Sequence, residues 1–370
     1  MKCRYFLVLI SLNLFLFNPS SSVPFQEVKT EVILYDDYFG LVPLPENAVE
    51  LIKKFSFSPL EMEQPVEMTD DSSGNIYITD DKRKAVLKFD SSGHYLGQFG
   101  QKGISKERFA LPQDILLTKD FIVVYDLKPG RVKYFDLGGD FIKSTKMYKN
   151  KIHDMAINED GLLFLAKALS DEDSALIDVF SPEGILRYSF GELIFGHFSV
   201  YGIHPLNSRK LGFTEKGELL VAFSYFPAVR KYSQDGRLLA EYKIDNGIME
   251  AKEKLNLKLL GRARRTKFHQ AYAQAIIAIK SFEGKIYLLG NYPRLEILQI
   301  NDSGKIERTY WTEYDALSKP KDFIVQRVGG QIRFYVLITE PEISVDVLVE
   351  NHSEDKSQGI ENVAKKPISD

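Results

Sequence analysis

The stretch "NIYITDDKRKAVLKFDSSGHYLGQFG", residues 75–100, contains three strand-like runs separated by turn residues. The first run ends in two aspartates, the second leads from Ala85 to Asp90 and into Ser-Ser-Gly, and the third leaves from Tyr95. β-Branched and aromatic residues favour strands, and a glycine between two such runs supplies the positive φ of a tight hairpin. The stretch therefore predicts three consecutive antiparallel strands that end in Phe-Gly.

The hairpin pattern of this stretch returns along the chain. In each copy an apolar residue ends a strand, a few mostly polar or small residues follow, and a glycine opens the next strand. These glycines are Gly93, Gly139, Gly184, Gly236 and Gly304. Each is preceded at a nearly constant interval by a run with the pattern of a buried strand: 76–78, 121–124, 162–165, 219–221 and 286–289. Repeats of this kind indicate a modular β architecture.

Each repeat also has an earlier strand. In four units it begins at Pro65, Pro112, Ile152 and Pro320. Four strands in a unit of about 40–50 residues is the size of one blade of a β-propeller.

The last unit, residues 322–350, lacks its fourth strand. Residues 50–57 precede the first unit and have the pattern of the fourth strands elsewhere. If they complete the last blade, the ring closes and no long sheet edge stays exposed. The sequence therefore predicts an all-β, six-bladed β-propeller of four-stranded blades, closed by an N-terminal strand.

Residues 74–112 resemble an NHL repeat. They contain a glycine, a strand ending in Asp80, a second strand with the Gly93 hairpin, and then Phe99-Gly100 and Pro112. The second unit keeps fewer of these residues, and later units keep only the hairpin glycine and the strand pattern. The resemblance implies a six-bladed propeller. It implies no single activity, because the family includes binding scaffolds and a few enzymes and a fold does not fix a function.

The N-terminus has the pattern of a secretory signal peptide, residues 1–22. Lys2 and Arg4 precede an apolar run, residues 5–17, and the small residues Ser20 and Ser22 follow it. This order is typical of a cleaved signal, which predicts a periplasmic or extracellular protein. The alternative is an uncleaved membrane anchor, although the run is short for a bilayer span.

The other boundaries follow from composition. Residues 23–49 are expected to be a lead-in segment, residues 50–350 the propeller, and residues 351–370 a disordered tail, since the tail is polar and without periodicity. Cys3, the only cysteine, lies in the signal segment, so the mature chain would contain no disulfide. A net charge of −3 and export argue against a nucleic-acid partner. We expect a monomer without stable membrane insertion after signal cleavage.

Acidic residues occupy the same place in four units, at the start of the innermost strand: Glu67, Asp114, Asp154 and Asp322. In a propeller these starts surround one mouth of the central channel. Converging carboxylates would bind a polar ligand or a divalent cation, which prefers oxygen ligands. The alternative is that each acid caps its own strand start through nearby backbone amides. The other two units do not clearly supply an acid.

His153 directly precedes Asp154 and is the histidine placed to join such a site. The alternative is a solvent-facing or core histidine with a structural role. The sequence contains no Gly-x-Ser-x-Gly, His-Glu-x-x-His or phosphate-binding glycine loop.

An insert, residues 246–274, separates the fourth and fifth units and is rich in good helix formers. We expect four leucines to pack it onto the propeller: Leu255, Leu257, Leu259 and Leu260. A basic cluster follows: Arg262, Arg264, Arg265 and Lys267. It could meet an acidic partner, a lipid headgroup or a carboxylated ligand at the rim of the channel, or it could be a solvated helix face.

Two functions remain open from the sequence. The first is an exported, non-catalytic propeller that recognises a protein partner or a small polar ligand at the channel mouth, without a cofactor. The second is a metal-dependent enzyme of the lactonase or lyase kind, with Glu67, Asp114, Asp154 and His153 around a divalent cation.

Overall fold

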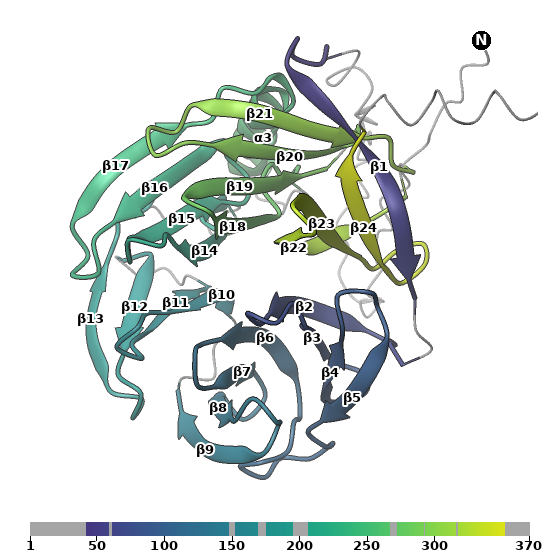
Figure 1. The fold of residues 1–370 in the computed structure, drawn as a ribbon. Coiled ribbons are helices and arrows are strands. Elements are labelled where there is room, and N and C mark those ends of the chain that lie inside the picture. Colours follow the sequence, from purple (N-terminus) through teal and green to yellow (C-terminus); the bar gives the residue numbers. More distant parts are fainter. Residues whose placement is uncertain are drawn as a thin grey trace, which may run out of the picture.

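The computed structural model describes residues 42–58, 61–147, 152–168, 175–194, 206–266, 272–291, 293–315 and 317–351. Within α3 (Gly247–Thr266) the side chains are described as far as Ala263. Six blades surround a central channel, and the chain passes from one blade to the next around the ring (Figure 1). The six-bladed all-β fold predicted from the repeats is confirmed.

The first three blades follow one another along the chain, each built from the channel outward. Blade 1 contains β2 (Pro65–Asp70), β3 (Ile76–Asp80), β4 (Ala85–Phe89) and β5 (Tyr95–Phe99). Blade 2 contains β6 (Pro112–Leu117), β7 (Ile122–Asp126), β8 (Arg131–Phe135) and β9 (Phe141–Lys146). Blade 3 contains β10 (Ile152–Ile157), β11 (Leu163–Lys167), β12 (Ile177–Phe180) and β13 (Leu186–Phe190).

The last three blades complete the ring. Blade 4 contains β14 (Arg209–Phe213), β15 (Leu219–Phe223), β16 (Ala228–Tyr232) and β17 (Leu238–Lys243). Blade 5 contains β18 (Ala278–Phe282), β19 (Lys285–Gly290), β20 (Leu295–Ile300) and β21 (Ile306–Thr312). Blade 6 contains β22 (Pro320–Val328), β23 (Gln331–Ile338), β24 (Ser344–Glu350) and, outermost, β1 (Ala48–Phe57).

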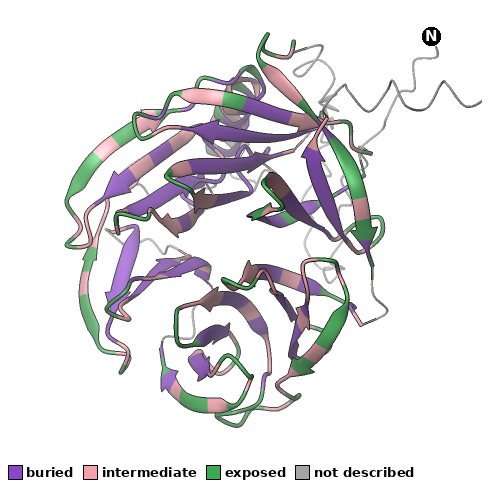
Figure 2. Ribbon diagram, viewed as in Figure 1, coloured by how far each residue is buried: buried purple, intermediate pink, exposed green. Residues whose placement is uncertain are grey.

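Burial changes systematically from the second to the fourth strand of a blade (Figure 2). Every residue of β3, β7 and β15 is buried, because both faces of these strands pack against neighbouring blades. The outermost strands β5 and β13 are largely exposed. The core therefore lies between blades, and its apolar contacts hold the ring together.

The N-terminal strand closes the ring as predicted. β1 pairs antiparallel with β24, from Leu51 opposite Glu350 to Phe57 opposite Val345. Its first residues, beginning at Ala48, also pair in parallel with β21. β1 thus joins blades 5 and 6 into one continuous sheet and leaves no unpaired edge at the junction.

The aromatic residue near the end of an outermost strand packs on the next blade's hairpin glycine. A Cβ atom added to Gly139 would lie 2.7 Å from the Phe99 side chain, and one added to Gly93 would lie 2.5 Å from Phe57. Both glycines have positive φ, 95° and 84°, so their backbone also disfavours larger residues. Phe57 of β1 therefore has the same role as Phe99 of β5, which explains why the Phe-Gly end and the hairpin glycine recur together.

In blades 1 and 2 an aspartate ends the second strand, Asp80 in β3 and Asp126 in β7. The Asp80 carboxylate accepts hydrogen bonds from the backbone N–H groups of Glu63 and Gln64, at 2.7 and 2.9 Å. Asp126 holds the chain entering blade 2 in the same way and also pairs with the buried Lys133 ammonium at 2.7 Å. These aspartates fix the connections between blades.

The insert between β17 and β18 contains the helix α3. Asn246 caps its N-terminus by accepting from the N–H groups of Ile248 and Met249. Leu255 and its neighbours Leu259 and Leu260 are buried as expected, but Leu257 is 46% exposed. The expectation for Leu257 was wrong because residues two apart face different sides of a helix. None of the helices in the described ranges has the length and apolar character needed to span a membrane.

Candidate functional site

The six innermost strands bring four carboxylates and two ammonium groups together at the middle of the channel. The carboxylates are those predicted from the sequence: Glu67 of β2, Asp114 of β6, Asp154 of β10 and Asp322 of β22. The ammonium groups belong to Lys210 of β14 and Lys280 of β18. Each blade thus contributes one charged side chain to a narrow constriction, hereafter the charged ring, and the two lysines were missed from the sequence.

The acids occur where the innermost strand is irregular. The pairing register shifts near Glu67 in β2 and at the acid in β6, β10 and β22, whereas β14 and β18 pair regularly with their neighbours. A β-bulge re-aims the side chain next to it and bends the strand. The bulges therefore turn the acids toward the channel axis, while Lys210 and Lys280 reach it from regular strands on long side chains.

Lys210 lies between two of the carboxylates. Its Nζ is 2.5 Å from Glu67 Oε1 and 3.4 Å from Asp154 Oδ1. The other oxygen of Asp154 accepts the backbone N–H of Leu211 at 2.6 Å. Blades 1, 3 and 4 are therefore connected across the channel by one ammonium group.

Lys280 pairs with Asp322. Its Nζ lies 3.1 Å from Oδ1 and 3.3 Å from Oδ2 of that carboxylate, which is only 2% exposed. The backbone N–H of Met68 donates to Asp322 Oδ2 at 3.0 Å. Asp322 therefore has donors from blades 1 and 5, and none of its charge is left uncompensated.

Asp114 differs from the other three acids. It is 6% exposed, and its Oδ2 is buried without a hydrogen-bond partner. Neither Lys210 nor Lys280 makes an ion pair with it. A buried carboxyl group without partners is costly in the charged form.

The acids of the charged ring have shifted pKa values of opposite sign. Burial raises the pKa of Glu67 to about 8, with Lys210 opposing the rise and the neighbouring carboxylates adding to it. Burial raises the pKa of Asp114 well above its usual range, and Asp154 and Glu67 add to the effect.

The pKa of Asp322 is lowered, although burial alone would raise it. Lys280 and Lys210 together outweigh burial, and a hydrogen bond with Glu67 lowers it further. Since Glu67 keeps its proton up to a higher pH, it is the donor in that bond. The pKa of Lys210 is held well above its usual range, because its surrounding carboxylates, Asp154 first, outweigh burial.

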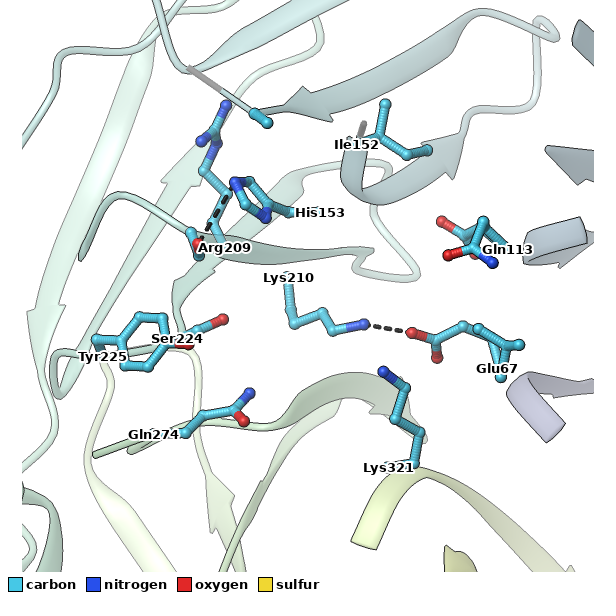
Figure 3. A pocket seen from close by; sticks show the side chains of 14 residues that line it. Glu67, Gln113, Ile152, His153, Arg209, Lys210, Ser224, Tyr225, Gln274 and Lys321 are labelled. Carbon is cyan, nitrogen blue, oxygen red and sulfur yellow. Dashed lines mark hydrogen bonds and ion pairs between the residues drawn. The ribbon is translucent and has the colours of Figure 1, made fainter. Parts of the chain in front are cut away.

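A cavity of about 500 Å³, hereafter the upper vestibule, lies where the innermost strands begin (Figure 3). The charged ring forms its floor through Glu67, Asp114 and Lys210. Its wall is polar and includes Gln113, His153, Ser208, Gln274 and Lys321. The ammonium end of Lys321 points into the cavity on the side of Glu67 and Lys210 (Figure 3).

A second cavity, of about 320 Å³, lies beyond the charged ring where the innermost strands end. Its lining is mostly apolar, with Asp70 and Lys280 as its charged groups. Burial raises the pKa of Asp70 to about 6, opposed by a hydrogen bond from Gln326. A third and much smaller cavity, of about 40 Å³, lies at the charged ring and shares lining residues with both of the others.

The remaining predicted site residues lie in different places. His153 lines the upper vestibule, with Nε2 3.3 Å from Ser208 Oγ. Arg262 lies on α3 and is not among the residues that line the vestibule. The side chains of Arg264 and Arg265 and the whole of Lys267 lie outside the described residues. The insert reaches the vestibule through Gln274 instead.

The arrangement is suited to polar recognition. Within the part of the chain that the structure describes, no three side chains of His, Cys, Asp or Glu are grouped so as to hold a metal ion. The cationic partners of Glu67, Asp154 and Asp322 are lysine ammonium groups. The site therefore offers both charged and neutral hydrogen-bonding groups on one side of the narrow charged ring.

Comparison with known sequences agrees with the fold. Residues 45–208 match the family described as DUF5128, 6-bladed beta-propeller. A stretch of 68 residues is 35% identical to the E3 ubiquitin-protein ligase NHLRC1 of Homo sapiens, covering 18% of this chain and 17% of that protein. The chain is an NHL-repeat-like six-bladed β-propeller. It covers only a small part of this curated relative's length, so the similarity concerns the repeat alone.

Solved structures with similar folds have varied functions. A member of the duf4221 family from Bacteroides vulgatus has a TM-score of 0.53 at 10% identity, covering 83% of this chain and 100% of that chain. Virginiamycin B lyase from Staphylococcus aureus has a TM-score of 0.51 at 12% identity, covering 81% and 99%. The PQQ-bound aldose sugar dehydrogenase from Streptomyces coelicolor has a TM-score of 0.50 at 12% identity, covering 83% and 100%. Identities this low establish the shared fold and nothing about activity.

Proposed function

We propose that this propeller is an exported binding protein that takes a small polar ligand into the upper vestibule. The observation that carries the proposal is the polar cavity of about 500 Å³ with the charged ring as its floor. A site of this size suits a small molecule, and convergent polar groups fix the orientation of a ligand. Gln113, Gln274 and Ser208 supply neutral donors and acceptors, and His153 and Lys321 add ionisable ones.

The proposal favours binding over metal-dependent catalysis. The enzyme alternative needs Glu67, Asp114 and Asp154 to present free oxygens to one cation. Glu67 and Asp154 instead share the Lys210 ammonium. An ammonium group at that place competes with a metal ion for the same lone pairs. The charged ring is therefore better explained as the rigid floor of a binding site.

Export is the second part of the proposal and rests on the signal-like residues 1–22. The measurement is the N-terminal mass of the protein recovered from its native cells. Cleavage near Ser22 supports export, and a mature chain that still begins at Met1 contradicts cleavage.

The binding proposal is tested by a thermal-shift panel of small sugars, amino acids, amines and carboxylates. A ligand that binds only the folded state raises the melting temperature by mass action. Ala168 lines the vestibule and is partly exposed, so Ala168→Trp would fill the cavity while Ala168→Ser leaves it open. The proposal predicts that stabilisation by a hit disappears in the tryptophan variant and persists in the serine variant. Hits that are unaffected by the tryptophan, or a panel without hits, would contradict it.

A further inference from the structure

Two ionisable groups of opposite type line the upper vestibule without an ion pair among the described residues. One is the Asp114 carboxyl group, more than nine-tenths buried, with Oδ2 unbonded. The other is the Lys321 ammonium, which takes part in none of the ion pairs or hydrogen bonds found among the described residues. Both residues line the same cavity.

The two groups lie at different depths. Asp114 lines both the vestibule and the narrow constriction beneath it, so it belongs to the floor. Lys321 is exposed and lines the vestibule but not the constriction. A ligand that enters from the mouth would meet the lysine near the rim and the carboxyl group at the bottom.

The charged ring shows which chemistry the acids accept. Glu67, Asp154 and Asp322 each have a lysine ammonium within 3.4 Å. Asp114 occupies the corresponding position in blade 2 and lacks one. A third ammonium group, supplied from outside, would give the fourth acid the partner that the other three have, and charge-assisted hydrogen bonds of this kind are the strong ones.

We propose that the upper vestibule binds a small zwitterion, with a primary ammonium group on Asp114 and an anionic group toward Lys321. This inference rests on the proposed function, because it assigns the chemical class of the ligand to the same cavity. A ligand with only an anionic group would leave the buried Asp114 carboxyl group without a partner, which is penalised, and a ligand with only an ammonium group would lose the attraction of the exposed Lys321.

The test uses isothermal titration of the full chain with β-alanine, γ-aminobutyrate and ε-aminocaproate. Each is compared with the alkylammonium ion and the alkylcarboxylate of the same chain length. We expect at least one of the three zwitterions to bind about tenfold or more tightly than both of its singly charged analogues, as the loss of one charge-assisted hydrogen bond predicts.

Two variants test the contacts of the two charged ends of the ligand one at a time. Asp114→Asn should weaken the preferred zwitterion by about tenfold or more and remove its advantage over the carboxylate, and Lys321→Gln should remove its advantage over the ammonium ion. Matched controls are Asp120→Asn and Lys119→Gln, which make the same charge changes at exposed positions of blade 2 that do not line the vestibule. Both controls should bind like the parent protein.

Three outcomes would overturn the inference. In the first, Asp114→Asn leaves zwitterion binding unchanged. In the second, the zwitterions bind no more tightly than their singly charged analogues. In the third, no zwitterion binds, and calcium ions added as calcium chloride bind in a way that depends on Asp114. If a neutral compound binds the parent protein and no longer binds the Ala168→Trp variant, the proposed function stands and only the ligand class is wrong. If no compound responds to that variant, both fail.

Discussion

Asp322 in blade 6 and Asp114 in blade 2 occupy the same position in their blades. Each lies two residues after a proline and directly after a shift in the pairing register of the innermost strand. Asp322 forms an ion pair with Lys280 and accepts a hydrogen bond from the Met68 N–H, and its pKa is lowered. Asp114 has no partner for Oδ2, and its pKa is raised well above the usual range.

The difference between the two acids comes from their neighbours and not from their own strands. Both are almost fully buried, at 2% and 6% exposure. The lysines of blades 4 and 5 reach the acids of blades 1, 3 and 6 and leave blade 2 without an ammonium group. A repeated position in a propeller can therefore be structural in one blade and available to a ligand in another.

Removal of the charge at these two positions should have very different effects on stability. Asp322→Asn replaces the buried member of the pair and leaves the partly buried Lys280 ammonium beside a neutral group, which should cost about 3–5 kcal/mol, as for other broken buried ion pairs. Asp114→Asn removes a group that has no ion pair and should change the free energy of unfolding by no more than about 1 kcal/mol. Urea unfolding of both variants measures the contrast. Similar losses in the two would show that Asp114 is paired after all.

Lys210→Met should destabilise less than Asp322→Asn. It leaves Glu67 and Asp154 without their ammonium group, but the raised pKa values show that both acids can take up protons. We expect a loss of about 1–3 kcal/mol that grows as the pH rises, since the acids must then ionise unpaired.

The double variant Lys210→Met with Glu67→Gln checks the cause. If the loss comes from the ion pair, the two changes should be coupled by about 0.5–3 kcal/mol in a double-mutant cycle. Purely additive effects would contradict the pairing of Lys210 with Glu67.

Glu67→Gln should reduce the pH dependence of stability. Burial raises the pKa of Glu67 from 4.5 to about 8, so in this interval the folded protein holds a proton that the unfolded chain has released. Its contribution to stability is therefore fully present below pH 4.5 and is lost as the pH rises toward about 8. The free energy of unfolding measured across this interval should fall less steeply in the variant. An unchanged slope would mean that another group carries the proton.

The smallest effect is expected for an exposed ion pair in the same blade as Asp322. Lys319 and Glu340 have side chains that are 63% and 56% exposed. Lys319→Gln should change the free energy of unfolding by about 1 kcal/mol or less, since water screens such pairs. A loss as large as that of Asp322→Asn would remove the distinction between buried and surface charges on which the comparison depends.

The fold could be predicted from the sequence because its signals are local and repeated. A glycine that needs positive φ, such as Gly93 or Gly139, marks each hairpin, and an aromatic such as Phe99 packs against the next glycine. Closure by β1 could be predicted because the last unit lacked a strand and residues 50–57 had the matching pattern. The face of α3 was partly wrong, because Leu257 was counted as a packing residue without regard to helical periodicity.

The site could be predicted only in part. A proline marks the strand start before three of the four acids, which made their common position visible in the sequence. Lys210 and Lys280 lie in regular strands without a turn signal, and the helix before β18 disrupts the repeat spacing. For Lys280 the signal that could have revealed it was its position directly after the apolar run of residues 275–279. The pairing of each lysine depends on distances across the channel, which repeat spacing does not encode.

The most direct test of this account is a titration of the Asp114 and Asp322 carboxyl carbons by NMR in aspartate-labelled protein, assigned with Asp114→Asn. The account predicts that Asp322 titrates below 3.8 and that Asp114 keeps its proton far above that value. Two aspartates that titrate together near the ordinary value would contradict the claim that a lysine pairs with Asp322 and that none pairs with Asp114.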